Sequence, residues 1–178
     1  MTNLIPAWRD GTLGPVDKLE VHRLGLRHPA ISVFVLDGDR ILLQRRALGK
    51  YHTPGLWANT CCTHPHWGEP MADCALRRLG EELGIRGLAL IPRGQLEYRA
   101  DVGNGLIEHE MVDLFVGEAS ADLTLAPDPD EVMDTRWTAI DDLRAEISAD
   151  PSRFTPWLRI YLEKHADAIF GPEGPDAN

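Results

Sequence analysis

The clearest hydrophobic pattern lies in the stretch AISVFVLDGDRILLQRR, at residues 30–46. Two apolar runs flank an Asp-Gly pair there, and that pair suits the tight turn of a β-hairpin. The stretch therefore predicts two antiparallel strands. Further strand-like runs occur at about 88–99, 106–118 and 133–138, and the turn signal DVGNG separates the first two of them.

Two segments have the spacing or the end signals of helices. From about residue 70, apolar residues recur every three or four positions up to Leu83, and Gly84 is placed to end that helix. Near the C-terminus, TPWLRIYLEKHADAIF has Thr155 as the N-cap and Pro156 at the first helical position, which predicts another helix. A helix between strands, followed by helix at the end, indicates an α+β or mixed α/β layered domain.

Three segments lack a regular pattern. Residues 1–28 are too mixed to assign. Residues 49–69 are rich in Gly and Pro and predict a long loop of the length that functional loops have. The tail at about 171–178, GPEGPDAN, is expected to be flexible.

The length of 178 residues suits a single domain spanning 1–178. No apolar run approaches the ~20 residues that span a bilayer, and the first residues lack the pattern of a signal peptide. We therefore expect a cytoplasmic protein without a membrane partner. The three cysteines cannot all pair, and thiols stay reduced in that compartment, which argues against a disulfide framework.

The formal net charge of −10 argues against nucleic acid, because binding phosphate backbones requires clustered positive charge. Basic clusters nevertheless exist locally, in QRRALGK and in LRRLGEELG. They are Arg45, Arg46, Lys50, Arg77 and Arg78. Each cluster alone is typical of a solvated basic face, whereas together they could form a pocket for a phosphorylated substrate.

Acidic and imidazole side chains offer a possible metal site. In LIEHEMVDLF, the strand period of two places Glu108 and Glu110 on one face, where they repel unless a cation or proton lies between them. With His22, His28 and His64 they would make five N/O ligands, a set that suits Mn²⁺, Zn²⁺ or Fe²⁺ and favours an octahedral ion. Any one of these histidines, taken alone, is more often an ordinary surface or core residue.

The string RRLGEELGI resembles the second half of the Nudix box, and Glu69 matches the earlier glutamate of that box. Two positions depart from it: Arg78 stands where the box has its glutamate, and Thr63 where it has its first glycine. In Nudix hydrolases this helix binds Mg²⁺ for diphosphate hydrolysis, so the missing acidic ligand argues against hydrolysis. Without the resemblance, Arg78 and Glu82 would be interpreted as an i,i+4 surface salt bridge.

A more specific resemblance runs from about His22 to Trp157. The motifs that carry it are HPAISVFV, QRRALGK, PGLWANTCCTHP, GEP, RRLGEELG, EYRADVGNGLIEHE, DEVMDTRW and FTPWL. Their order and spacing resemble type I isopentenyl diphosphate isomerase, a Nudix-fold enzyme of isoprenoid biosynthesis. The resemblance implies an α/β/α sandwich with a mixed β-sheet flanked by helices, and an N-terminal extension of about residues 1–28 that carries metal-ligand histidines.

The resemblance also implies a role for individual residues. Cys62 matches the catalytic cysteine, Glu110 the second catalytic group, and Tyr98 a supporting hydroxyl, while Cys61 falls on a variable position. The implied ligands of one metal site are His22, His28, His64, Glu108 and Glu110. Glu82 matches a residue that holds Mg²⁺ against the diphosphate. The implied substrate-binding residues are Arg46, Lys50 and Arg78 around the diphosphate and Trp157 beside the hydrocarbon.

The implied reaction converts isopentenyl diphosphate to dimethylallyl diphosphate by adding one proton and removing another, through a carbocation. We expect one Mg²⁺ ion to bind together with the diphosphate. At the His/Glu site we expect one Mn²⁺ or Zn²⁺ ion, with Mg²⁺ or Fe²⁺ as alternatives. The expected partner is a small isoprenoid diphosphate, and the expected state is a monomer or weak homodimer. The alternatives are a Nudix pyrophosphohydrolase and a non-enzymatic metal-binding domain.

Overall fold

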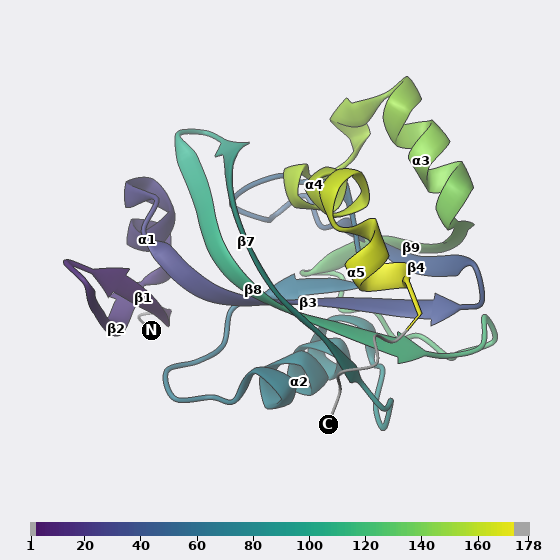
Figure 1. Ribbon diagram of the computed structural model, residues 1–178, viewed down its shortest axis with the longest axis horizontal. Coiled ribbons are helices and arrows are strands. Elements are labelled where there is room, and N and C mark those ends of the chain that lie inside the picture. Colours follow the sequence, from purple (N-terminus) through teal and green to yellow (C-terminus); the bar gives the residue numbers. More distant parts are fainter. Residues whose placement is uncertain (1–2, 173–178) are drawn as a thin grey trace.

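The computed structural model describes residues 3–172 and shows a mixed β-sheet between two layers of helices (Figure 1). The strands of the sheet are β3 (Arg27–Asp37), β4 (Arg40–Arg46), β5 (Trp57–Ala58), β6 (Cys61–Thr63), β7 (Ile91–Gly103), β8 (Leu106–Glu118) and β9 (Val132–Ala139). One face is covered by α2 (Met71–Leu83), and the other by α3 (Ile140–Ala149), α4 (Pro156–Lys164) and α5 (Ala166–Phe170). This arrangement confirms the predicted α/β/α sandwich.

The sheet is mixed because β3 and β8 run parallel, whereas the other strand pairs are antiparallel. The strand order is β5-β4-β3-β8-β7, and in addition β6 pairs with β3 and β9 pairs with β4. The central strand β3 therefore has neighbours on both edges. Its position explains why the sequence of this strand is apolar along most of its length.

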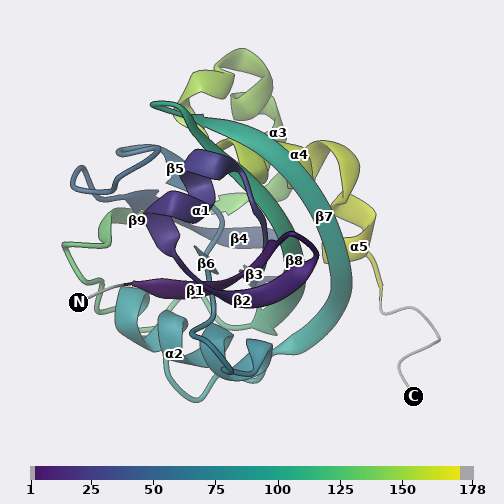
Figure 2. The same cartoon turned by 90° about the vertical axis from the view of Figure 1, so that its left-hand side faces the viewer.

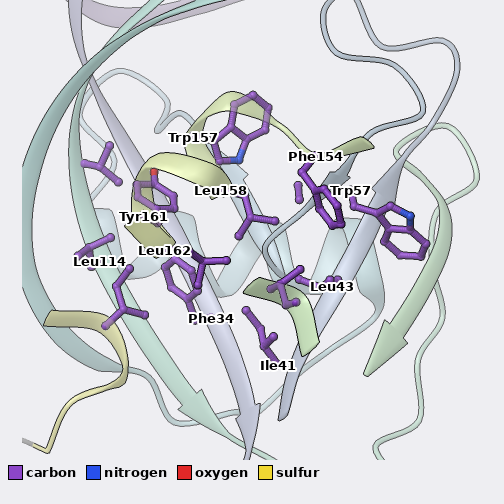
Figure 3. Close-up of a cluster of buried hydrophobic side chains, with 14 of the residues drawn as sticks. Phe34, Ile41, Leu43, Trp57, Leu114, Phe154, Trp157, Leu158, Tyr161 and Leu162 are labelled. Atoms are coloured by element: carbon purple, nitrogen blue, oxygen red, sulfur yellow. The ribbon is translucent and has the colours of Figure 1, made fainter. Parts of the chain in front are cut away.

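Alternate residues of β3 build two separate cores. Ile31, Val33 and Val35 face α2, while Phe34 and Leu36 face α3, α4 and α5. Figure 3 shows the second core, in which aromatic residues of α4 pack on Phe34 and its neighbours. The strand period of two thus decides which layer each side chain of β3 contacts.

The hairpin predicted at residues 30–46 is confirmed, and so is a turn between the strand-like runs on either side of DVGNG. Leu36 pairs with Ile41 across the β3–β4 turn, where Gly38 adopts a left-handed φ of 60°. The β7–β8 turn lies at Asn104, which has a φ of 57° between two glycines that also have positive φ. Strand β7 extends to Gly103 rather than ending near residue 99, so most of the predicted turn motif belongs to the strand.

The helix over residues 71–83 is confirmed, and Gly84 ends it in a left-handed conformation with a φ of 71°. The single C-terminal helix predicted from the sequence is wrong, because the chain breaks at His165 and forms α4 and α5. This break redirects the chain so that Ile169 is fully buried in the same core as Phe34. Thr155 occupies the predicted N-cap, but its side chain makes no capping hydrogen bond.

The N-terminal segment, which the sequence left unassigned, is ordered into β1 (Leu4–Arg9), β2 (Thr12–Asp17) and α1 (Lys18–Leu24). The side chain of Asp17 caps α1, because its Oδ1 accepts hydrogen bonds from the backbone nitrogens of Leu19 and Glu20, at 3.0 and 3.1 Å. Figure 2 views the molecule from the end of the sheet at which these three elements lie. Helix α1 contacts β8 there, which places its histidine beside the sheet.

The predicted loop at 49–69 contains the short strands β5 and β6, and both belong to the sheet. Helix α3 and the short 3₁₀ helix at Pro151–Arg153 were not predicted. Residues 173–178 of the predicted flexible tail lie outside the described residues. Within residues 3–172, no helix combines the length and hydropathy needed to cross a membrane.

Candidate active site and metal centre

Most of the site residues predicted from the sequence line one small inner cavity of about 30 Å³. It lies where α1, α2, α4, β6 and the ends of β4, β7 and β8 converge. The predicted residues in its lining are Arg46, Lys50, Cys62, His64, Arg78, Glu82, Tyr98, Glu108, Glu110 and Trp157. His22 and His28 are fully buried next to this lining. Segments far apart in the sequence therefore form one site.

Four of the predicted metal ligands form a tight cluster. His22 comes from α1, His28 from β3, His64 from the residue after β6, and Glu110 from β8; each offers a ligand atom within 4.8 Å of the others. Nε2 of His64 lies 3.1 Å from Nε2 of His28 and 2.9 Å from Oε1 of Glu110. Donor atoms at such spacing suit a single small cation.

The tautomers of two histidines support this interpretation. Nδ1 of His22 lies 2.7 Å from the carbonyl oxygen of Lys18, and Nδ1 of His28 lies 2.7 Å from that of Leu26. A carbonyl can only accept, so both Nδ1 atoms carry the proton and both Nε2 atoms direct a lone pair into the cluster. Burial lowers the pKa of His22 to about 4 and that of His64 well below its usual value. The rings of His22 and His64 are therefore neutral at neutral pH, and the cluster fits a divalent ion.

Glu108, the fifth predicted ligand, lies in a second group of possible ligands with His22 and His52. The hydroxyl of Tyr98 lies 2.8 Å from Oε2 of Glu108 and 2.8 Å from Oε2 of Glu110, so it bridges the two carboxylates. His52 was not predicted, because no local pattern connects it with residues 22 and 108.

The two carboxylates differ in charge. Burial, and then the charge of Glu110, raise the pKa of Glu108 well above its usual value. Burial would also raise the pKa of Glu110, but contacts with His28 and His64 outweigh it and hold this pKa well below the usual range. Without a cation the pair therefore shares about one proton, which a bound divalent ion would displace.

The adjacent cysteines point to opposite sides of the sheet. In the pairing of β6 with β3, Val33 is opposite Cys61 and Ser32 is opposite Cys62. Cys61 is fully buried in the core under α2, as expected for a packing residue, whereas Cys62 lines the inner cavity. All three cysteines, including buried Cys74, are free thiols.

The environment of Cys62 keeps its proton on sulfur. Its Sγ lies 2.6 Å from Oγ of Ser32, which in turn lies 2.8 Å from the hydroxyl of Tyr161. Burial raises the pKa of the Cys62 thiol well above its usual value, and the nearby charge of Glu110 adds to that effect. The side chain is therefore a thiol that can donate a proton.

The other half of the inner cavity is cationic. Arg46, Lys50, Arg78 and Lys18 line it, and Lys18 was not predicted. Burial, followed by the charges of the other three, lowers the pKa of Lys18 to about 8, which shows how closely the four cations converge. No signal in the sequence could identify Lys18, because its place depends on how the unassigned N-terminal segment packs.

The predicted salt bridge between Arg78 and Glu82 exists, at 2.6 Å between Nη2 and Oε1, but it is not on the surface, because Glu82 is buried and Arg78 is half-buried. Gln44 donates to the other oxygen of Glu82 at 2.8 Å. Glu131, which the sequence did not indicate, pairs with Lys50 and, at 3.2 Å, with Arg78. These acidic partners hold the cationic side chains in place within the cavity.

The remaining residues of the two basic clusters have structural partners outside the inner cavity. Arg45 donates to the carbonyl of Gly55 at 2.9 Å, and Arg77 forms a two-point ion pair with Glu69 at 2.6 and 2.8 Å. Part of each basic cluster thus supports the loop and helix that surround the site.

Among the residues that line the inner cavity, the buried Nε–H groups of Arg46 and Arg78 and the indole N–H of Trp157 lack a hydrogen-bond partner. The guanidinium of Arg46 lies 5.3 Å from the ring of Trp157, so the cationic half adjoins the aromatic wall. A larger outer cavity of about 360 Å³ shares Lys18, Lys50, Tyr51 and Arg78 with the inner one. The inner cavity holds about one water, so a larger ligand fits there only if side chains of the lining move.

Comparisons with known proteins agree with this fold. The NUDIX domain family matches residues 26–158. A protein of Cereibacter sphaeroides named isopentenyl-diphosphate Delta-isomerase is 66% identical over 171 residues, covering 96% of this chain and 97% of its own. One with the same name from Rhodobacter capsulatus is 66% identical over 169 residues, covering 95% and 96%.

Solved structures show the same fold at lower identity. A structure from Deinococcus radiodurans aligns with a TM-score of 0.71 at 14% identity, over 90% of this chain and 96% of that one. A MutT NUDIX hydrolase from Burkholderia pseudomallei aligns with a TM-score of 0.60 at 25% identity, over 78% and 98%.

Proposed function

This chain belongs to the isopentenyl-diphosphate Delta-isomerases, within the NUDIX domain family, and we propose that Cys62 and Glu110 carry out the proton transfers of its reaction. The enzyme converts isopentenyl diphosphate to dimethylallyl diphosphate in isoprenoid biosynthesis. One observation carries the assignment of residues: Cys62, Glu110 and Trp157 line the same buried cavity, whose remaining wall carries four cationic side chains.

The reaction needs two proton-transfer groups held close to a flat alkene. One adds a proton to the terminal carbon, and the other removes a proton from C2. An unactivated alkene is a very weak base, so the acid must be aligned with it and kept from water, which would trap the carbocation. Cys62 approaches the cavity from β6 and Glu110 from β8, so that one can donate while the other accepts. The two groups exchange roles in the reverse reaction.

Neighbouring side chains would hold these groups in position. Ser32, with Tyr161 behind it, contacts the Cys62 sulfur, and the Tyr98 hydroxyl contacts Glu110. The ring of Trp157 would stabilise the carbocation through its π face, by about 1 to 2 kcal/mol.

The cationic half of the cavity would bind the diphosphate as an anchor remote from the reacting carbons. Arg46, Lys50 and Arg78 supply charge, with Lys18 beside them, and the free Nε–H groups of Arg46 and Arg78 supply donors. We assign Glu82 to a Mg²⁺ ion that enters with the diphosphate. That role requires Glu82 to exchange at least part of its contacts with Arg78 and Gln44 for the ion.

The His/Glu group would hold a second divalent ion, for which we propose Mn²⁺ or Zn²⁺, with Mg²⁺ or Fe²⁺ as alternatives. Its ligands would be His22, His28, His64, Glu108 and Glu110. When bound, such an ion supplies positive charge that fixes the Glu110 carboxylate and tunes its proton affinity.

Product analysis tests this function against hydrolysis. The purified protein is incubated with isopentenyl diphosphate, Mg²⁺ and Mn²⁺, and dimethylallyl diphosphate and inorganic phosphate are both measured. We expect the isomer and no released phosphate, because Arg78 replaces an acidic residue of the Nudix box. Phosphate release without isomer would identify a pyrophosphohydrolase, and neither product would indicate a binding protein.

We further propose that residues 1–178 form one domain and that the enzyme acts in the cytoplasm as a monomer or weak homodimer, with neither nucleic acid nor membrane as a partner. Light scattering across a concentration series would measure the oligomeric state. A single cooperative unfolding transition is expected of one domain.

A further inference from the structure

A fourth histidine lies at the proposed metal centre. His52 belongs to the loop between β4 and β5, and its side chain is buried. Its Nε2 lies 3.4 Å from Oε1 of Glu108, and its ring stacks on that of His22 with the centroids 5.6 Å apart. His52, His22 and Glu108 each offer one ligand atom, and all three atoms lie within 4.8 Å of one another.

The distance between His52 and Glu108 suits two ligand atoms on adjacent positions of one metal ion better than it suits a hydrogen bond. A buried N–H that donates to a carboxylate usually lies about 2.7 to 2.9 Å from it. Ligand atoms on adjacent corners of an ion, each about 2.1 Å from the metal, lie roughly 3 Å apart. The neighbouring contacts of the cluster, between 2.9 and 3.6 Å, fall around the same value.

The opposite nitrogen of His52 has a partner of its own. Nδ1 lies 3.1 Å from Oγ1 of Thr53, which can accept its proton. With the proton on Nδ1, the lone pair of Nε2 faces the carboxylate of Glu108. When a cation displaces the proton that Glu108 and Glu110 share, this lone pair and the carboxylate both face the cation, which removes their mutual repulsion.

The two groups of possible ligands are joined by His22. Since Nδ1 of His22 donates to the carbonyl of Lys18, this residue offers a single ligand atom and can bind only one ion. Tyr98 bridges Glu108 and Glu110 on the other side, which also connects the groups. Only His22 belongs to both groups, so an ion bound by all six residues would draw the two groups together.

We propose that His52 is a sixth protein ligand of this centre and binds through Nε2 on the side of Glu108. This inference rests on the metal site of the proposed function. Four imidazoles and two carboxylates fill the positions of an octahedral ion, which favours Mn²⁺ or Fe²⁺ over tetrahedral Zn²⁺. A filled centre leaves no position for water, so the ion acts on Glu110 and not as a hydrolytic site. The hydroxyl of Tyr51, 3.3 Å from Nε2 of His22, would cover it from the outer cavity.

The test replaces His52 with Ala and with Gln and measures the binding of Co²⁺ instead of activity. His52→Gln keeps an N–H that could donate to Glu108 but loses the imidazole ligand. His109→Ala is the matched control, because His109 lies between the two glutamates of β8 yet contacts Glu97, at 2.9 Å. Circular dichroism and thermal unfolding verify that each variant is folded.

We expect both His52 variants to bind Co²⁺ at least about tenfold more weakly in competition with a chelator. Their visible absorption should be stronger than that of the parent, because octahedral Co²⁺ absorbs weakly and centres of lower coordination absorb more. Added imidazole should restore the weak spectrum in His52→Ala, and the His109 control should match the parent. Parent-like affinity and spectrum in His52→Gln would overturn the assignment of His52 while leaving the centre intact, whereas a parent protein that binds no Co²⁺ would overturn the metal centre itself.

Discussion

Replacing Glu110 with Gln tests the proton-transfer role of this residue, because the side chain keeps its shape and loses its basic oxygen. Oε1 of Glu110 contacts His64 at 2.9 Å, and Oε2 contacts Tyr98 at 2.8 Å. The amide oxygen of Gln can occupy the first position. Its amide N–H can then donate to the Tyr98 oxygen while the Tyr98 hydroxyl donates to Glu108, so every hydrogen bond of the buried group can still be formed.

Two effects set the expected loss of turnover. Removing a proton-transfer group typically costs about 10² to 10⁴-fold. Glu110 would also bind the ion, and a neutral amide is the weaker ligand, so we expect a fall of at least ~10³-fold. Substrate affinity should stay within a few fold of the parent value, because Arg46, Lys50 and Arg78 are unchanged.

The assay measures the formation of dimethylallyl diphosphate at saturating metal, together with calorimetric binding of isopentenyl diphosphate. Glu97→Gln is the control: Glu97 lies on the adjacent strand β7 but is 45% exposed and pairs with Arg27. The control should retain parent activity. Near-normal turnover in Glu110→Gln would refute the assignment and direct attention to Tyr98 as the second proton carrier. A loss of binding equal to the loss of turnover would mean that the variant had disturbed the cavity as a whole.

Three further results are expected. Prolonged chelation should abolish activity, and Mg²⁺ alone should not fully restore it; full activity in protein that elemental analysis finds free of transition metal would refute the His/Glu site. The pKa of Lys18 is about 8, so its charge is present below that pH and is lost above it; kcat/KM should fall above pH 8, and Lys18→Arg should move that fall to higher pH. Trp157→Leu should lower turnover about 5- to 30-fold through loss of the π face, with Trp157→Phe intermediate; parent turnover in a folded Leu variant would remove Trp157 from the mechanism.

Local signals account for the elements that the sequence predicted correctly. The Asp-Gly turn, the glycine at the end of α2 and the alternation in β8 act within a few residues, and each has the expected structure. The same alternation placed Glu108 and Glu110 on one face. The break at His165 had no such signal, because it depends on where Ile169 can pack.

The site was harder to predict because its parts meet only after folding. Lys18 and His22 come from α1, whose position depends on how the β1–β2 hairpin and α1 pack beside the sheet. His52 and Glu131 lie in connecting segments that have no periodic pattern. Their roles depend on distances to residues on other elements, and no spacing along the chain encodes those distances.

The two adjacent thiols permit a comparison within one protein. Cys62→Ala removes a cavity-lining sulfur, while Cys61→Ala removes a sulfur buried in the core under α2. The second change should cost about 1 kcal/mol of stability, comparable with deleting one buried methylene group, and leave most of the activity. An alkylating or epoxide mimic of the substrate should modify Cys62 in preference to Cys61 and Cys74.

The measurement that tests the central claim most directly is the turnover of Cys62→Ala together with its metal content. If Cys62 carries a proton, the variant forms no dimethylallyl diphosphate and retains its transition metal at the parent stoichiometry. Loss of the metal along with activity would make Cys62 a ligand beside His64 instead, since thiolates bind such ions strongly. An equal loss of activity in Cys61→Ala would show that the wrong cysteine had been assigned.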